Sequence, residues 1–300
     1  MSDPSRPVLV TGASRGIGRA IALELAAAGF SVWAGVRSQA AAAELTSLAK
    51  ARRTSIRPVL LEVTSKDSIE NAVGTIGETH GRLFGLVNNA GITGRAFFED
   101  YPDEFVRKIF DVNLFGAMDV TRRALPLLRA NKGARIVMIS SIGGRIGSNS
   151  VAPYCASKFA LEGFAESLSI EVKPFGIDVT IVSPGIVRTE IWDEATRILP
   201  EARNPASPCY EYFWRMEGHA ARLLESSRVT PEQVAQRVLR TMLAKRPRLR
   251  YIVGRRAAIV ASLRRHLPGE LFERLYFGEF VRRMTARTTR LPPVSRDEVA

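Results

Sequence analysis

Short apolar segments alternate with helical patterns along the first two thirds of the chain, and this alternation restricts the fold more than any other feature. Between the apolar segments, apolar residues recur at helical spacing, and the longest such stretch runs from Asp103 to Asn131. Unbroken strand–helix alternation is typical of a parallel sheet with helices on both faces. We therefore expect an α/β fold with a doubly wound parallel sheet. The expected strands are Pro7–Val10, Ser31–Val36, Ile56–Val63, Leu83–Val87, Arg135–Ile139 and Ile177–Val182.

A glycine-rich turn, from Thr11 to Gly18, joins the first strand to the first helix. Glycines at such a turn let the backbone approach a ligand, and the start of the helix directs N–H groups at a phosphate. The strand before it and the helix after it supply the context that a nucleotide site requires. An ordinary tight turn is the alternative.

Two arginines favour one form of a dinucleotide. The second strand ends at Val36 and is followed by Arg37-Ser38, where an acid would bind the ribose 2′-hydroxyl of NAD. Arg15 adds a second cation inside the glycine turn. The arginine fork suits phosphate, so we expect NADP rather than NAD. Two solvated surface arginines would give the same pattern.

Tyr154 and Lys158 are four residues apart in a helical stretch, so both side chains lie on one face of the helix. A free tyrosine ionises near pH ~10, and a neighbouring positive charge lowers that pKa. Ser140-Ser141 follow an apolar strand at the edge of the sheet where active sites of open sheets lie. Tyr154, Lys158 and Ser141 are therefore the candidates for proton transfer, although this spacing also arises by chance.

Amides provide further candidates. Asn88-Asn89-Ala90-Gly91 follows the fourth strand, where it can tie neighbouring strands and leave room for a flat cofactor, although a plain turn would look similar. Asn113 lies inside a helical stretch, which is mildly unfavourable for asparagine. Its apolar neighbours favour a buried role over a surface one. His80, before Gly81, is interpreted as a helix-end residue.

These motifs occur in one order, and together they resemble the short-chain dehydrogenase/reductase family over roughly Pro7 to Gly254. The resemblance implies a Rossmann-type fold with a nicotinamide cofactor. In chain order the motifs are Thr11-Gly12-x-x-x-Gly16-x-Gly18, Asn88-Asn89-Ala90-Gly91, Asn113, Ser141, Tyr154-x-x-x-Lys158 and Pro184-Gly185.

The resemblance also implies a role for each matching residue. Tyr154 is similar to the general acid/base, and Ser141 to the residue that holds the substrate oxygen. Lys158 resembles the group that lowers the tyrosine pKa and binds the nicotinamide ribose. Asn113 resembles the anchor of a proton-relay water, and Thr189 is placed to bond the carboxamide. The implied cofactor-binding residues are Gly12, Ser14, Arg15, Gly16, Ile17, Gly18, Arg37, Ser38, Glu62, Val63, Asn89, Ala90, Gly91, Tyr154, Lys158, Pro184, Gly185, Val187 and Thr189. At Glu62 family members often have Asp, and the longer acid shifts that contact.

The region from 189 to 229 reads as irregular, and in the family it is the substrate lid. Its aromatic side chains bring large apolar area, which favours a bulky lipophilic ligand. Packing of the lid on the sheet is the alternative for each of them. His219 is interpreted as a surface residue of a helix, with contact to the substrate as the alternative. Besides Ser141 and Tyr154, the residues expected at the substrate are Trp192, Phe213 and Trp214. An Arg-Tyr-x-x-Gly sequence at 250–254 is similar to members that act on retinoids and 17-keto or 17-hydroxysteroids.

A basic C-terminal segment carries most of the formal charge of +13, with fourteen Lys or Arg and five Asp or Glu in 245–300. Apolar residues at helical spacing predict two basic amphipathic helices broken at Pro268-Gly269. We expect residues 1–254 to form the cofactor-binding domain and 255–300 to form an extension that covers it, rests on an anionic membrane, or does both. The tail contains no recognised nucleic-acid-binding motif, so nucleic acid is not an expected partner.

Cys155 and Cys209 form no disulfide framework, and with three scattered histidines no metal site is expected. No secretory signal or spanning segment is visible, so a cytoplasmic protein is expected, with membrane contact only at the surface. The resemblance implies a homodimer or homotetramer.

The sequence thus predicts an NADP(H)-dependent carbonyl reductase or alcohol dehydrogenase in which Tyr154 moves the proton. The alternative is a cofactor-binding sensor or scaffold without turnover. The four residues Asn113, Ser141, Tyr154 and Lys158 favour the enzyme, because a protein that had lost turnover would not need them all.

Overall fold

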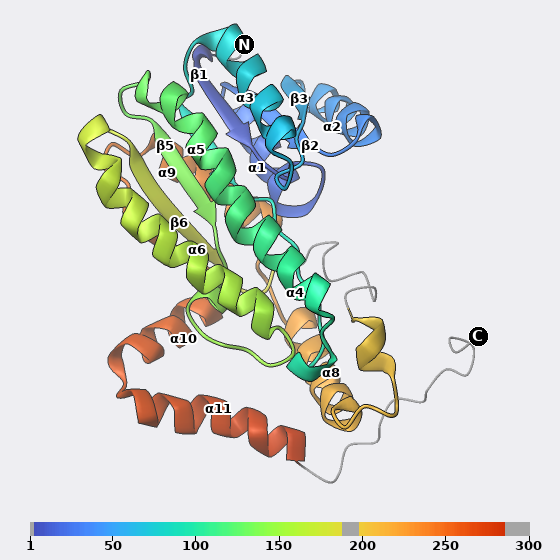
Figure 1. Cartoon of the computed structure of the whole chain (residues 1–300). Helices are drawn as coiled ribbons and strands as arrows, with labels where there is room; N and C mark the ends of the chain where they lie inside the picture. Colours follow the sequence, from blue (N-terminus) through green and yellow to red (C-terminus); the bar gives the residue numbers. More distant parts are fainter. Residues whose placement is uncertain (1–2, 188–197, 286–300) are drawn as a thin grey trace.

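A seven-stranded parallel sheet forms the centre of the protein, in a computed structural model that describes residues 3–187 and 198–285 (Figure 1). Its strand order is β3-β2-β1-β4-β5-β6-β7, so the chain runs outward in one direction and then returns to run outward in the other. This confirms the doubly wound fold. The strands are β1 (Asp3–Val10), β2 (Phe30–Val36), β3 (Ile56–Leu60), β4 (Gly85–Asn88), β5 (Arg135–Ile139), β6 (Asp178–Pro184) and β7 (Arg250–Val253).

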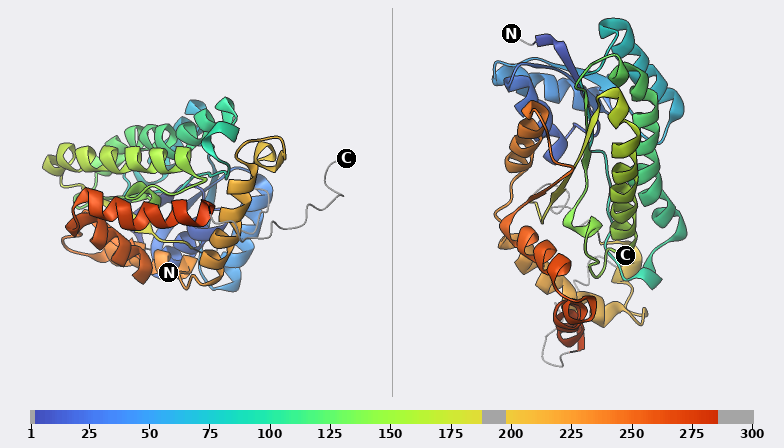
Figure 2. Two further views of the ribbon diagram at one scale, coloured as in Figure 1. Left: turned by 90° about the horizontal axis from the view of Figure 1, so that it is seen from below. Right: turned by 90° about the vertical axis from the view of Figure 1, so that its left-hand side faces the viewer.

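Helices cover both faces of the sheet (Figures 1 and 2). One face is covered by α1 (Gly16–Ala27), α2 (Gln39–Ala51) and α9 (Pro231–Leu243). The other is covered by α3 (Lys66–His80), α5 (Gly116–Arg129) and α6 (Ala152–Glu171). The remaining helices are α4 (Asp103–Phe110), α8 (Tyr210–Glu225), α10 (Arg255–His266) and α11 (Gly269–Thr285).

Each face of the sheet has its own apolar core because alternate strand residues point to opposite sides. Val8 and Val10 of β1 pack under α1 and α9, whereas Leu9 packs under α3 and α5. Each fully buried aliphatic side chain contributes about 1.5–3 kcal/mol. The sheet is therefore rigid enough to hold its loops in fixed positions.

Local signals fix several helix ends as predicted. Ser65 caps α3, and Gly81 ends it in the left-handed conformation at φ 63°. Thr230 and Gln233 form a reciprocal capping box at the start of α9. These ends depend only on residues close in sequence, which is why the sequence predicts them.

Two expected stretches differ in the structure. The helix expected over 103–131 consists of α4, a π-helical turn at Asp111–Phe115, and α5. The wider turn makes room for Asn113, whose side chain is buried and bonded outside the helix. The lid region expected to be irregular contains α8, a four-turn helix.

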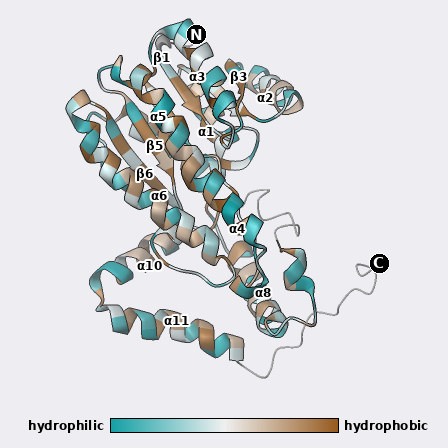
Figure 3. Ribbon diagram, in the orientation of Figure 1, coloured by the Kyte–Doolittle hydropathy of each residue, from teal (hydrophilic) through white to brown (hydrophobic). Residues whose placement is uncertain are grey.

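The two C-terminal helices, α10 and α11, lie where a broken pair was predicted, on either side of Pro268. Arg215 of α8 donates to the carbonyl of Met284 at 3.2 Å, and the His219 and Phe280 rings meet edge to face. Apolar and polar residues alternate along α11 (Figure 3). One side of α11 therefore packs on α8, while Leu271 and Leu275 remain exposed.

Candidate active site

A cavity of about 670 Å³ opens at the carboxyl edge of the sheet, where the loops after β1, β2, β4, β5 and β6 meet. This is the edge at which open α/β sheets bind ligands. The cavity is lined by every expected cofactor residue within the described part of the chain except Ser38, which instead caps α2 by accepting from Ala41 N at 3.2 Å. Thr189 lies outside the described residues.

The glycine turn lets the start of α1 approach the end of β1 closely, because Gly12 and Gly18 carry no side chains. A Cβ on Gly18 would lie 2.2 Å from the carbonyl oxygen of Gly12, and Gly12 itself has φ +64°. The Thr11 hydroxyl accepts from the backbone N–H groups of Asn89 and Ala90, at 3.0 Å each. The Asn89 amide donates back to the carbonyls of Thr11 and Gly12, at 3.0 and 3.1 Å. Asn89 thus ties the two strands together, as expected.

The start of α1 opens on this cavity, since Gly16, Ile17 and Gly18 all line it. Arg15, at the N-cap, supplies no side-chain hydrogen bond to the helix. A helix N-terminus that meets a cavity through glycines suits a diphosphate. The residues present therefore fit a dinucleotide cofactor.

Arg15 and Arg37 line the same end of the cavity and are both exposed. The Glu62 carboxylate also lies there, and it accepts from the N–H and the hydroxyl of Thr64, at 3.2 and 3.1 Å. The carboxylate is thereby held by its own loop. This end of the cavity accordingly offers guanidinium groups to a phosphate.

Tyr154 and Ser141 both line the cavity, on either side of Gly143, where a Cβ would lie 3.4 Å from the Tyr154 ring and 3.5 Å from the Ser141 hydroxyl. Burial raises the pKa of Tyr154 to about 12, and hydrogen bonding by the neighbouring Ser141 hydroxyl acts in the opposite direction. The Ser141 oxygen also accepts from Gly143 N at 3.1 Å, which fixes its position. The two hydroxyls can therefore both reach one substrate oxygen.

Lys158 lies one turn along α6 from Tyr154, with its nitrogen 5.8 Å from the centre of the tyrosine ring. Its ammonium donates to the carbonyl of Ile139 at 2.9 Å. Burial lowers the pKa of Lys158 to about 8. The expected lowering of the Tyr154 pKa by Lys158 stays a prediction.

Asn113 lies behind the cavity wall. Its oxygen accepts from Ile92 N at 2.8 Å, and its amide donates to Ile92 O and to the Ser157 hydroxyl at 3.0 Å each. It therefore joins the loop after β4 to α6, next to Lys158. Its expected role as the anchor of a proton-relay water stays a prediction.

The far end of the cavity is apolar and is formed by α8 and α11. Phe213 and Trp214, expected at the substrate, do not line it; they pack with Tyr101 and Leu199 in a separate apolar cluster. Trp192 lies outside the described residues. The lining side chains here are Met216, His219, Ala220, Leu223, Leu224, Tyr276 and Phe280.

Sequence reasoning missed this wall because it treated the region as irregular. The spacing of Met216, Ala220 and Leu223, at i, i+4 and i+7, is the helical signal that identifies them. His219, interpreted as a surface residue, lines the cavity and contacts Arg283 at 2.8 Å.

Comparisons with known proteins agree with this geometry. A family model described as short chain dehydrogenase matches residues 6–198. An uncharacterized oxidoreductase, YusZ of Bacillus subtilis, is 35% identical over 268 residues, covering 88% of this chain and 95% of that protein. Mouse retinol dehydrogenase 5 is 33% identical, covering 89% of this chain and 86% of that protein. The crystal structure of a short-chain dehydrogenase from Streptomyces avermitilis matches with a TM-score of 0.75 at 30% identity, covering 95% of this chain and all of that one.

Proposed function

This chain belongs to the short-chain dehydrogenase family and is an oxidoreductase of the nicotinamide-dependent type, and from that premise we propose that it interconverts a ketone or aldehyde and an alcohol with NADP(H). The observation that carries the proposal is that Tyr154 and Ser141 lie on either side of Gly143, with Lys158 nearby, in the cavity that the glycine turn also lines. When bound, the cofactor supplies or accepts the hydride.

The residues of the chain supply the proton and the geometry. In reduction, the Tyr154 hydroxyl donates its proton to the carbonyl oxygen as that oxygen gains charge. The Ser141 hydroxyl donates to the same oxygen and holds it in place. The Lys158 ammonium, 5.8 Å from the centre of the tyrosine ring, stabilises the phenolate that remains. The reverse steps serve oxidation.

The preference for NADP(H) rests on Arg37 and Arg15, which line the end of the cavity beyond β2. A 2′-phosphate bound there would be held by these guanidinium groups, whose planar fork can donate to two phosphate oxygens. The loop holds the nearby carboxylate of Glu62 through Thr64. We therefore assign the phosphate-bearing cofactor.

The proposed substrate is bulky and lipophilic, such as a steroid, retinoid or aryl ketone. Met216, Leu223, Tyr276 and Phe280 give the far wall a broad apolar surface. Ligand sites of this kind combine apolar walls with a few convergent polar groups. Here the polar groups are the hydroxyls of Tyr154 and Ser141.

A screen of NADPH oxidation across steroid ketones, retinal and aliphatic ketones tests the function, with alcohols and NADP⁺ for the reverse direction. Turnover is expected with the bulky substrates and is expected to be lost in Tyr154→Phe. Tight NADPH binding without turnover on any substrate would instead support the alternative of a silent sensor or scaffold.

None of the helices in the described part of the chain combines the length and the apolar character that a membrane span requires. We propose that α10 and α11 instead rest on an anionic bilayer surface. Ile259 and Leu263 on α10, and Leu271 and Leu275 on α11, are exposed among arginines. Basic helices with exposed apolar residues bind such interfaces, where a lipophilic substrate would be dissolved.

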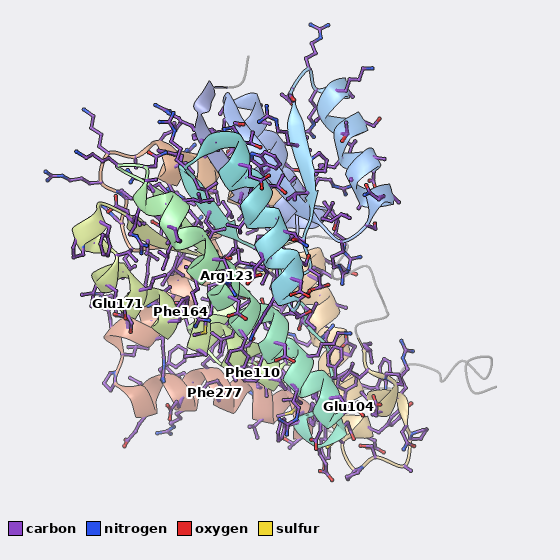
Figure 4. The ribbon with its side chains drawn as sticks, turned by 45° about the horizontal axis from the view of Figure 1, so that its top comes forward. Glu104, Phe110, Arg123, Phe164, Glu171 and Phe277 are labelled. Atoms are coloured by element: carbon purple, nitrogen blue, oxygen red, sulfur yellow. The ribbon has the colours of Figure 1, made fainter. Side chains whose placement is uncertain are left out.

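We also propose that the chain forms a homodimer or homotetramer through the layer of α4, α5 and α6. Figure 4 shows Phe110, Arg123 and Phe164 along this layer. Phe115 and Phe159, on neighbouring segments of it, are about half exposed, at 51% and 47%. Light scattering at micromolar concentration tests this proposal, and a monomeric mass would reject it.

A further inference from the structure

Glu162 is a buried carboxylate, 5% exposed, one turn beyond Lys158 on α6. Its Oε1 accepts from the hydroxyls of Ser140 at 3.1 Å and Ser183 at 2.9 Å. Its Oε2 faces Arg250 Nε at 3.4 Å and Arg145 Nη1 at 3.7 Å. The two serine hydroxyls thus donate to one carboxylate oxygen, and the two arginines face the other.

Three of the four partners adjoin residues that line the cavity. Ser140 immediately follows β5 and precedes Ser141, and Ser183 on β6 immediately precedes Pro184 and Gly185 of the cavity wall. Arg145 follows the 3₁₀ turn that begins after Ser141, and Arg250 begins β7. One carboxylate therefore holds the ends of three neighbouring strands.

The same interactions fix where α6 lies along β5. Lys158 binds the carbonyl of Ile139, and Glu162 binds the hydroxyl of the next residue, Ser140. The two segments approach each other closely at Gly144, where a Cβ would lie 2.6 Å from the Ser140 hydroxyl and 2.9 Å from the carbonyl of Lys158. A shift of α6 along the strand would break these contacts together.

We propose that Glu162 is a positioning residue for the reaction, setting the hydroxyl of Tyr154 on α6 against that of Ser141 after β5. Through Ser183 it also holds the Pro184–Gly185 segment against which the nicotinamide would lie. The inference rests on the proposed function. It depends on the negative charge of the carboxylate, because two arginines face Oε2. A glutamine could still bind the serine hydroxyls, which accept as well as donate, but it would remove the charge that faces Arg145 and Arg250.

Glu162→Gln and Glu166→Gln make a matched pair for the test. Glu166 also binds Arg250, at 2.7 Å, but it is exposed on the outer side of α6. Misplacement of reacting groups by about 1 Å can cost up to ~10²-fold in rate. We expect Glu162→Gln to lower kcat about 10- to 100-fold, with the Kd for NADPH within about 2-fold of the wild-type value. Glu166→Gln is expected to behave as wild type.

The isotope effect separates a positioning role from a purely structural one. With NADPH deuterated at the transferred position, Glu162→Gln is expected to show a larger deuterium isotope effect on kcat than the wild type does. The reason is that the chemical step has become slower relative to product release. If Glu162→Gln does not fold, Ser140→Ala and Ser183→Ala each remove one of its hydrogen bonds and are expected to give the same signature. Folded variants with wild-type kcat and isotope effect would overturn the inference alone. Wild-type protein without turnover would overturn the proposed function and this inference with it.

Discussion

The ammonium of Lys158 donates to the main-chain carbonyl of Ile139 across 2.9 Å, which brings the positive charge of α6 onto the end of β5. The side chain is 4% exposed, so a cation is held where little water reaches it. The protonated form of the side chain loses solvation in this position. The charge therefore carries a cost in stability that depends on pH.

Lys158→Met should remove a pH dependence of stability. The folded pKa of Lys158, about 8, lies below its value of 10.5 in the unfolded chain. Its stabilising contribution is therefore fully present above pH 10.5 and is lost as the pH falls to 8. As the pH rises from 8 to 10.5, the free energy of unfolding of the wild type should therefore rise by about 3 kcal/mol relative to that of the variant. Urea denaturation at a series of pH values measures this difference. The control is Lys50→Met, at an exposed lysine. If the free energies of unfolding of the wild type and Lys158→Met change in parallel with pH, the prediction is wrong.

Tyr154→Phe should lower kcat by a factor on the order of 10² or more, because it removes the proton donor and almost no volume. NADPH binding, measured by fluorescence titration, should be retained. Tyr212→Phe, on the exposed side of α8, should leave the rate unchanged. Near-normal turnover of Tyr154→Phe at neutral pH would show that another group moves the proton.

Arg37→Ala should raise the Michaelis constant for NADPH much more than that for NADH, because only NADPH carries the 2′-phosphate. The difference between the cofactors should shrink as salt is added, since Arg37 is exposed and its interaction is screened. Lys50→Ala removes an exposed charge in the last turn of α2 that does not line the cavity, and it serves as control. Equal changes for both cofactors would rule out a phosphate-binding role.

Phe280→Ala should lower kcat/KM for bulky ketones about 10-fold and leave small aliphatic ketones little affected, because it removes apolar area from the far wall only. Phe98→Ala, at a phenylalanine that is 68% exposed, is the matched control. Steady-state kinetics on one large and one small ketone decide the matter. Equal losses on both would argue against a substrate site at α11.

The Leu271→Ser, Leu275→Ser double variant should weaken binding to vesicles of mixed zwitterionic and anionic lipid. Both side chains are exposed, so the fold should be retained. Wild-type protein should sediment with anionic vesicles at low salt and not with purely zwitterionic ones, because arginines supply much of the attraction. No sedimentation at low ionic strength would leave α10 and α11 as a cover for the domain.

The sequence predicts the sheet and much of the cofactor site because both depend on local patterns. Glycines and amides at strand ends, such as Gly12 and Asn89, lie at fixed offsets from apolar runs, and parallel strands bring those ends to one edge. The box at Thr230 and Gln233 is local in the same way. Such signals do not require knowledge of distant contacts.

The apolar wall and the π-helical turn depend on contacts far apart in sequence. Tyr276 and Phe280 reach the cavity only because α11 packs back onto α8. Because Phe213 and Trp214 are aromatic, the sequence predicts them at the substrate. They lie nearer the start of α8 than its cavity-lining residues do, and they pack into a separate apolar cluster. Asn113 distorts its helix because Ile92 and Ser157 offer it partners. None of these partnerships can be read from periodicity alone.

The α8–α11 wall has a consequence for how such a protein can diversify. The cofactor turn, Ser141, Tyr154 and Lys158 all lie within residues 6–198, whereas the wall from Met216 to Phe280 is encoded later in the chain. The residues proposed for the chemistry and those proposed for substrate choice therefore lie in successive segments of the chain. Recombination near that boundary could exchange the wall and keep the reaction, so relatives with the same catalytic set can diverge in the molecules they accept.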